Sequence, residues 1–359
     1  MSSPEGPEGR SERTRPALLG RLTSWDAVII GVLVLFLVVA SVAVDNFAGS
    51  RNAAFLVLDL APILLIALPM TLIIVTGEID LSVASTLGLS SAVMGALWEG
   101  GLPSETIIPL CVVLGAVLGA VNGVFVTGFG LPSLAVTIGT LALYRGLAFV
   151  VLGDRAVADF PESYTDLVIG RVAGTAVPTL LLPLLVACLA FGVVLHATPL
   201  GRSLFALGAN DTAARFAGTR VRRVKFWLYV VTGAVAGLAG VLWTLRYSSA
   251  RADNGAGLEL AVVAAVLLGG VSVFGGRGTL WGVVAGVLLL ASLQNALRLA
   301  DVSNEALSVV TGVLLIGSVL APNLAAAVAA RLRRARRSGP PAPPVPDPAP
   351  SPTPALRSS

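Results

Sequence analysis

The sequence predicts an all-α polytopic membrane protein with about ten transmembrane helices, an inverted repeat and a short cytoplasmic helix. Composition is the first reason: 55% of the 359 residues are hydrophobic and only 12% are charged. A soluble domain cannot keep that much apolar surface away from water. The second reason is that the apolar residues form runs of roughly 20 residues, the length that a helix needs to cross a bilayer. The third reason is the charge of the loops, which differs between the two sides.

Two polar tails flank the predicted transmembrane domain, which covers residues 25–330. Residues 1–24 contain proline, glycine and four arginines. Residues 331–359 begin with the basic run RLRRARR and continue as the proline-rich PPAPPVPDPAPSPTP. Segments of this composition do not bury enough apolar surface to fold, so both tails are expected to be disordered.

The membrane domain contains apolar segments of near-spanning length, which are the predicted transmembrane helices. They are 27–44, 54–75, 81–98, 106–127, 133–152, 176–196, 226–245, 258–274, 279–297 and 306–329. An even number of spans places both basic tails on one side, and the positive-inside rule makes that side the cytoplasm. The arginine-rich loop 197–225 then lies in the cytoplasm as well. The loop 153–175 carries four acidic residues against two arginines and lies outside.

Glycine spacing indicates an inverted repeat. The segment GAVLGAVNG at 115–123 matches GTLWGVVAG at 278–286, which lies 163 residues further along the chain. Five spans separate the two segments, an odd number, so the two halves are expected to have opposite orientations in the membrane. Glycine at every fourth position also lets two helices approach closely.

The loop 197–225 contains a predicted short helix in the segment GANDTAARFAGTRV, residues 208–221. Asn210 or Asp211 can accept hydrogen bonds from the free N–H groups of its first turn. Gly218 suits the left-handed position that ends a helix. Surrounding arginines indicate either a docking surface for a cytoplasmic partner or an ordinary positively charged loop.

Acidic residues at membrane depth are the first candidates for a site, because a charge there is costly unless it faces a cavity, a partner or water. Glu78 and Asp80 lie in TGEIDLS, a break between two apolar runs that ends at Ser82. Asp80 can also cap the helix that follows. Glu259, at the start of the eighth apolar segment, is a third acid of this kind.

A row of hydroxyl groups is a second candidate. In LPSLAVTIGTLALYRG, Thr137, Thr140 and Tyr144 are spaced three to four residues apart and share one face of the predicted helix. Such a face either hydrogen-bonds a hydroxylated solute or bonds to a neighbouring helix, and Asn122 and Asn295 leave the same alternatives open. The predicted translocation pathway therefore consists of Glu78, Asp80, Ser82, Asn122, Thr137, Thr140, Tyr144, Glu259 and Asn295.

The sequence offers no catalytic or metal site. His196 is the only histidine, and Cys111 and Cys188 lie in apolar runs, so no metal motif or catalytic dyad can be built. The glycine-rich stretch 267–282 lacks the GxxxxGK(S/T) pattern of a nucleotide-binding loop. The net charge of +4 reports membrane orientation and gives no sign of nucleic-acid binding. If ATP drives transport, ATP and Mg²⁺ bind another polypeptide.

Together these motifs resemble the permease subunits of bacterial ABC importers for monosaccharides, the ribose/xylose/rhamnose family. The resemblance covers roughly residues 50–322, with the motifs in the family's order. They are TGEIDLSVAS, LPSLAVTIGTLALYRGLAFV, TPLGRSLFALGANDTAARFAGTRVRRVKFWLY and GLELAVVAAVLLGGVSVFGGRGTLWG. The resemblance implies an inner-membrane dimer of identical or paralogous permeases, two cytoplasmic ATPase subunits that bind ATP and Mg²⁺, and an external sugar-binding protein.

In that family the cytoplasmic loop couples the ATPase to the membrane spans. The resemblance implies that Asn210, Ala213, Ala214 and Gly218 belong to this coupling helix, and Arg202 and Arg215 are its candidate basic neighbours. Two positions depart from the family, which usually has glycine in place of Glu78 and often in place of Ala84. The stretches RADNGAGLEL and RLADVSNEALSVVTG look closest to rhamnose-type permeases.

Other functions fit parts of the same pattern. In an ion-coupled secondary transporter, Glu78, Asp80 and Glu259 would relay protons or ions. An ABC permease for branched-chain amino acids is an alternative within the same class. An intramembrane enzyme is the third alternative, and the missing histidine motif and dyad argue against it.

Overall fold

The computed structural model describes residues 25–173, 175–303, 305–318 and Leu320, and within these residues the regular elements are helices. Two isolated β-bridges, Val157 to Ala250 and Arg171 to Pro178, are the extended pairings there. Among the described residues, six helices are long and apolar enough to cross a membrane. They are α2 (Trp25–Ala43), α3 (Ser50–Val75), α5 with its π-helical extension η1 (Ser104–Gly123 and Val124–Gly128), α6 (Ser133–Leu152), α11 (Val221–Tyr247) and α13 (Leu280–Leu299).

A seventh span is counted if α8 (Leu181–Ala197) and α9 (Pro199–Ala209), which are bent by 66° at Thr198, are taken together. The predicted spans 81–98 and 258–274 contain shorter helices, namely α4 (Val83–Glu99) with 17 residues and α12 (Leu258–Leu268) with 11. The final predicted span begins as the helix Glu305–Ser318. The described part of the chain therefore supports six or seven spans by length and composition, and about ten is not confirmed. The predicted tails 1–24 and 331–359 lie outside the described residues.

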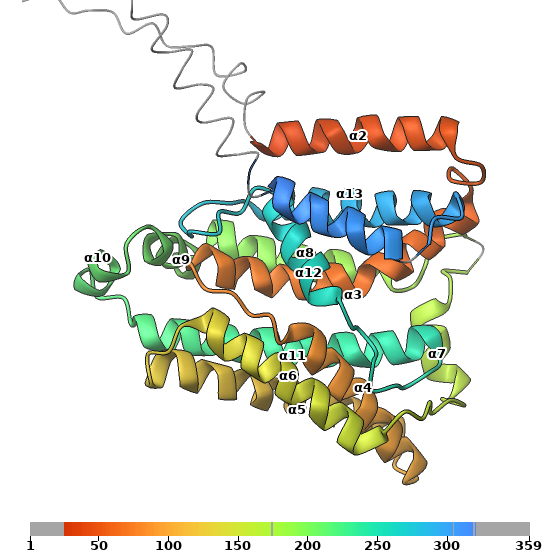
Figure 1. Ribbon diagram of the computed structural model, residues 1–359, viewed down its shortest axis with the longest axis horizontal. Coiled ribbons are helices and arrows are strands. Elements are labelled where there is room, and N and C mark those ends of the chain that lie inside the picture. The colour runs from red at the N-terminus through yellow and green to blue at the C-terminus, as the bar shows by residue number, and fades with distance from the viewer. Residues whose placement is uncertain (1–24, 174, 304, 319, 321–359) are drawn as a thin grey trace, which may run out of the picture. The chain divides into compact units, whose positions relative to one another are not determined.

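The helix α3 occupies the centre of the described fold. Every residue from Leu60 to Val75 is buried, as expected for a helix that is apolar on all faces. It contacts α8, α11, α12 and α13, and Figure 1 shows it between α13 on one side and α11 on the other. Its C-terminal end at Val75 leads directly into the break, residues 76–82, that separates it from α4.

Glycines allow the closest helix contacts, as the spacing predicts. A Cβ atom at Gly115 or Gly119 of α5 would overlap the carbonyl oxygens of Gly233 or Tyr229 in α11. A Cβ atom at Gly282 or Gly286 of α13 would likewise overlap carbonyl oxygens at the C-terminal end of α12. Small residues thus bring α5 against α11, and α13 against α12.

In each half of the chain, two helices pack against a long helix of the other half. Helices α4 and α5 of the first half pack against α11, and α12 and α13 of the second half pack against α3. The helices α9 and α10 (Asp211–Phe216) come between the halves and lie together at one end of the helices in Figure 1. The short helix α7 (Glu162–Ile169) contacts α11 and lies at the other end.

Candidate functional site

The helix α10 is present in the segment predicted to be cytoplasmic, and both of its ends are as expected. The Asn210 side chain accepts a hydrogen bond from the Ala213 N–H at 2.9 Å, which caps the first turn. Gly218 has a φ of +89°, the left-handed conformation. The N–H of Gly218 donates to the Arg215 carbonyl and that of Thr219 to the Ala214 carbonyl, the two bonds of a Schellman ending. A single-turn element is thereby closed by its own hydrogen bonds.

The surface of α10 is mostly free. Ala214 is buried, but Ala213 and Arg215 are exposed, and Phe216 is 89% exposed. Arg215 forms a weak i,i+4 contact with Asp211, with a nitrogen–oxygen distance of 4.0 Å. An exposed aromatic ring beside a cation is typical of the residues that anchor protein interfaces. Phe216 was not among the predicted site residues, although a large aromatic residue in a short polar helix could have indicated a binding surface.

The helix α9 connects α10 to the membrane part. Thr198 caps it by accepting a hydrogen bond from the Gly201 N–H at 3.2 Å, and Pro199 occupies its first position. Arg202 is exposed on α9. We call α9 and α10 together the α9–α10 arm, residues 199–216.

Three glycine-containing motifs meet where the arm contacts the break. A Cβ atom at Gly208, in the last turn of α9, would overlap the carbonyl oxygen of Val75 and the backbone nitrogen of Gly276. A Cβ atom at Gly275 would lie 2.9 Å from both the Gly208 Cα and the Gly77 nitrogen. The Gly276 N–H donates to the Val75 carbonyl at 2.8 Å. The arm, the break and the loop between α12 and α13 are thus in backbone contact.

The predicted pathway residues nearest to the break are held by one another. Asp80 is 1% exposed, and its Oδ1 accepts from the Ser82 N–H at 2.9 Å and the Ser82 hydroxyl at 2.7 Å. The Asn122 side chain donates to the Ser82 hydroxyl oxygen at 2.8 Å. The Asn122 Oδ1 is buried and has no hydrogen-bond partner within the described part of the chain. This arrangement orders the turn before α4, but the N-cap residue of α4 is Ser82 and no side chain of the described residues caps its first turn, so Asp80 is not the cap that the sequence allowed.

The hydroxyl row of α6 faces the interior of the protein. The Thr137 hydroxyl donates to the Ile79 carbonyl in the break at 3.4 Å, and the Tyr144 hydroxyl donates to the Leu118 carbonyl of α5 at 2.9 Å. Thr140 bonds within its own helix, to the Val136 carbonyl at 3.2 Å. All three hydroxyl residues are buried. Their hydrogen bonds are to this chain, and contact with a solute stays a prediction.

Two predicted residues lie elsewhere. Asn295 of α13 and Asn52 of α3 exchange side-chain hydrogen bonds at 2.9 and 3.0 Å, which joins α13 to the N-terminal end of α3. Glu259 is partly buried in the first turn of α12. The break therefore contains Glu78, Asp80 and Ser82, and hydrogen bonds join Asn122 and Thr137 to it, whereas Asn295 and Glu259 lie elsewhere in the fold.

Glu78 forms an ion pair that the sequence did not reveal. Its Oε1 lies 2.7 Å from the Lys225 ammonium in α11, and the two side chains are only 18% and 13% exposed. Lys225 also lies 3.7 Å from Asp211 Oδ2 in α10. A polar cavity of about 360 Å³ adjoins this pair and is lined on one side by Arg215 and Arg222. The sequence feature that could have pointed to Lys225 is that it is the only lysine in the chain.

A second charged group was also missed. Asp59 in α3 lies 3.2 Å from an Arg246 nitrogen and 3.8 Å from an Arg298 nitrogen. The pairing joins α3, α11 and α13. The signal was an aspartate inside the predicted span 54–75, where an unpaired charge is costly.

The loop between α11 and α12 is held by a partly buried arginine of α6. Arg145 donates to the carbonyl oxygens of Ala252 and Asn254, each at 2.8 Å, and to that of Ala84 at 3.3 Å. In the same loop, a hydrogen bond from Arg251 lowers the pKa of the Asp253 carboxyl below its usual value. The loop is therefore an ordered, polar element.

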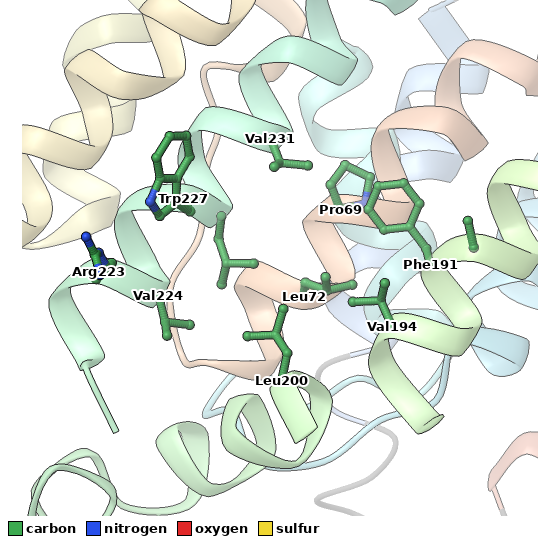
Figure 2. Close-up of a pocket in the computed structure, with 11 residues that line it drawn as sticks. Pro69, Leu72, Phe191, Val194, Leu200, Arg223, Val224, Trp227 and Val231 are labelled. Carbon is green, nitrogen blue, oxygen red and sulfur yellow. The ribbon is translucent and has the colours of Figure 1, made fainter. Parts of the chain in front are cut away.

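One cavity among the described residues is apolar (Figure 2). It measures about 490 Å³ and lies between α3, α8, α9 and α11. Pro69, Leu72, Phe191, Val194 and Trp227 point into it, and Arg223 stands at its edge in Figure 2. Such walls offer a hydroxylated solute no hydrogen-bonding partners, so this cavity does not fit a sugar site. Among the described residues, no group of three His, Cys, Asp or Glu side chains is placed to hold a metal ion.

Comparison with known proteins gives a family match over most of the chain. The family described as "Branched-chain amino acid transport system / permease component" matches residues 52–319. The autoinducer 2 import system permease protein LsrD of Yersinia enterocolitica is 32% identical over 302 residues, which are 82% of this chain and 91% of that protein. LsrD of Photorhabdus luminescens is 30% identical over 308 residues, covering 84% and 92% of the two chains. LsrD of Salmonella paratyphi A is 31% identical over 302 residues, covering 82% and 90%. No solved structure matches the chain.

Proposed function

Because the chain belongs to this family of bacterial ABC transport permeases, we propose that it forms the transmembrane pathway of an importer for a monosaccharide or a related small solute. A separate cytoplasmic ATPase drives the transport, and an external binding protein delivers the solute. The observation that carries the proposal is the capped helix α10, which presents an exposed phenylalanine and contacts the break through α9.

In this function α10 is the coupling helix and the ATPase binds its exposed face. Phe216 is the anchor, and Arg202 and Arg215 are the charged neighbours that orient the partner. Asn210 and Gly218 shape the helix by closing its two ends. ATP binding then acts by favouring one of two arrangements of the membrane helices.

The proposed orientation follows from charge. The arm and the arginines around it face the cytoplasm, as the positive-inside rule requires, and both tails lie on that side of the bacterial inner membrane. The corresponding contacts of α3 with α12 and α13, and of α11 with α4 and α5, support the inverted repeat.

A second permease, identical or paralogous, completes the pathway in this proposal. Within the described part of one chain, the cavity of about 490 Å³ is apolar and the hydroxyl row is already hydrogen-bonded. The solute path is therefore expected between two permeases, and the polar break of each chain borders it.

The nature of the solute rests on the relatives, which are named as autoinducer 2 import permeases. Ribose and rhamnose are candidates through the monosaccharide resemblance of the sequence motifs. The ion-coupled alternative is less well supported, because Glu78 is paired with Lys225 and Asp80 with the Ser82 groups, so neither acid is left to relay ions.

Purification in mild detergent from the native host tests the proposal. We expect a stoichiometric ATPase to accompany the chain and to be lost in the Gly218→Val variant, which cannot adopt the left-handed ending of α10 without strain. Uptake of labelled ribose, rhamnose and autoinducer 2 in reconstituted vesicles then identifies the solute. A pure homo-oligomer that transports one of these solutes without ATP would contradict the proposal.

A further inference from the structure

We propose that the Glu78–Lys225 ion pair transmits the movement of α10 to the break between α3 and α4, so that both are positioning residues for transport. This inference rests on the proposed function, because it requires an ATPase that moves α10. It assigns to Glu78 a mechanical role inside the protein, in place of contact with the solute.

The geometry connects three segments through one ammonium group. Lys225 Nζ lies 2.7 Å from Glu78 in the break and 3.7 Å from Asp211 at the start of α10. The Lys225 and Glu78 side chains are mostly buried, so water screens their attraction only partly. Asp211 in turn lies 4.0 Å from Arg215, which continues the row of charges along α10.

The ion pair and the nearby glycine contact resist movements in opposite directions. Gly208 touches Val75 by van der Waals contact, which resists approach of the arm to the break but offers little resistance to separation. The Lys225 ammonium of α11, hydrogen-bonded to Glu78 at 2.7 Å and 3.7 Å from Asp211 of α10, is attracted to both carboxylates and so resists their separation. A coupling helix moves in both directions during a transport cycle, so one contact pushes the break and the other pulls it back.

The residue type fits this role. All other cations of the chain are arginines. A lysine ammonium is compact and carries three donors on a flexible stem, so it can serve two carboxylates while they move. The adjoining cavity of about 360 Å³ gives the side chain room to follow.

The test uses the full complex of permease, ATPase and binding protein in lipid vesicles. Ile79, which is partly buried beside Glu78 in the break, is replaced by cysteine and labelled with a water-soluble maleimide with and without ATP plus vanadate. The native cysteines Cys111 and Cys188 are buried and contribute little background. The variants are Lys225→Met, Glu78→Gln and their combination, with Glu99→Gln plus Arg155→Met, an exposed ion pair at the far end of α4, as the control.

We expect nucleotide to change the labelling rate in the wild type and in the control. In each single variant that change should fall by about tenfold, the scale of an allosteric coupling, while the ATPase still co-purifies. The double variant distinguishes a loss of transmission between α10 and the break from a loss of protein stability. Removing both charges leaves no unpaired buried charge, so thermal stability should return while the nucleotide response stays weak.

Two results would overturn the inference. One is a wild-type nucleotide response in either single variant, and the other is recovery of the response together with stability in the double variant. Absence of an ATPase from the wild-type complex would instead remove the proposed function, so the two failures are distinguishable.

Discussion

Gly208 and Val75 lie so close that a Cβ atom on residue 208 would overlap the Val75 carbonyl oxygen. The two residues come from the last turn of α9 and the last residue of α3. The end of the central helix is thus in direct contact with the base of the α9–α10 arm, and any displacement of the arm toward the membrane reaches α3 without an intermediate side chain.

We expect Gly208→Ala to abolish coupled uptake. The backbone of residue 208 is helical, so alanine suits its conformation, and the damage comes only from the overlap with Val75 and Gly276. Transport and ATPase activity in vesicles are the measurements. Gly146→Ala in α6, which meets nothing within 4 Å, is the matched control. Normal uptake in Gly208→Ala would mean that the contact is not needed.

Phe216→Ala should weaken ATPase association by about 10- to 100-fold, as expected for loss of an aromatic interface anchor. The ring is 89% exposed, so its removal leaves the free permease as stable as before. Binding of the isolated ATPase to the permease in nanodiscs measures the effect. Phe129→Ala, which removes another exposed ring, is the control. Equal weakening in both variants would show a nonspecific effect of apolar surface.

Gly119→Ala should lower the thermal stability of the permease by about 1–3 kcal/mol, because the added methyl group forces α5 away from α11. Thermal unfolding in detergent, followed through the exposure of buried cysteines, is a suitable measurement. Gly139→Ala in α6 has free space around its Cβ position and should leave stability unchanged or slightly higher. Equal stability of the two variants would contradict the close packing of α5 and α11.

Arg145→Met should lower stability by about 2–3 kcal/mol, since three backbone carbonyls lose a charged donor. The loop 248–257 should loosen first, which hydrogen exchange of that segment would detect. Arg155→Met removes an exposed arginine and should have little effect, as surface ion pairs contribute little. Unchanged exchange in Arg145→Met would mean that the loop is held by other contacts.

Local features could be predicted from the sequence, and contacts between distant segments could not. Asn210 and Gly218 were readable as the two ends of α10 because capping depends on the residue type at a fixed position. The partner of Glu78 was not readable, because Lys225 lies 147 residues away and only the fold brings them together. The same limit hid the contact of Gly208 with Gly275.

Hydropathy located most of the long helices and overestimated the length of α12. The boundaries of α2, α3, α6 and α13 agree with the predicted spans to within a few residues. Segment 81–98 corresponds to α4 to within two residues, whereas segment 258–274 is helical only over α12, which ends before the turn at Gly269 and Gly270. Segment 176–196 continues past its predicted end as a bent pair, because Thr198 and Pro199 start a new helix.

The closed ends of α10 have a consequence for biogenesis. A segment that orders only on contact with its partner loses conformational entropy at that moment, and the loss weakens binding. Here Asn210 and Gly218 fix the helix within the isolated chain, so the ATPase of the proposed function would meet a surface that is already folded. Insertion into the bilayer and recruitment of the ATPase are then separate events. An inserted permease can remain folded without an ATPase, and it can exchange one ATPase for another without refolding.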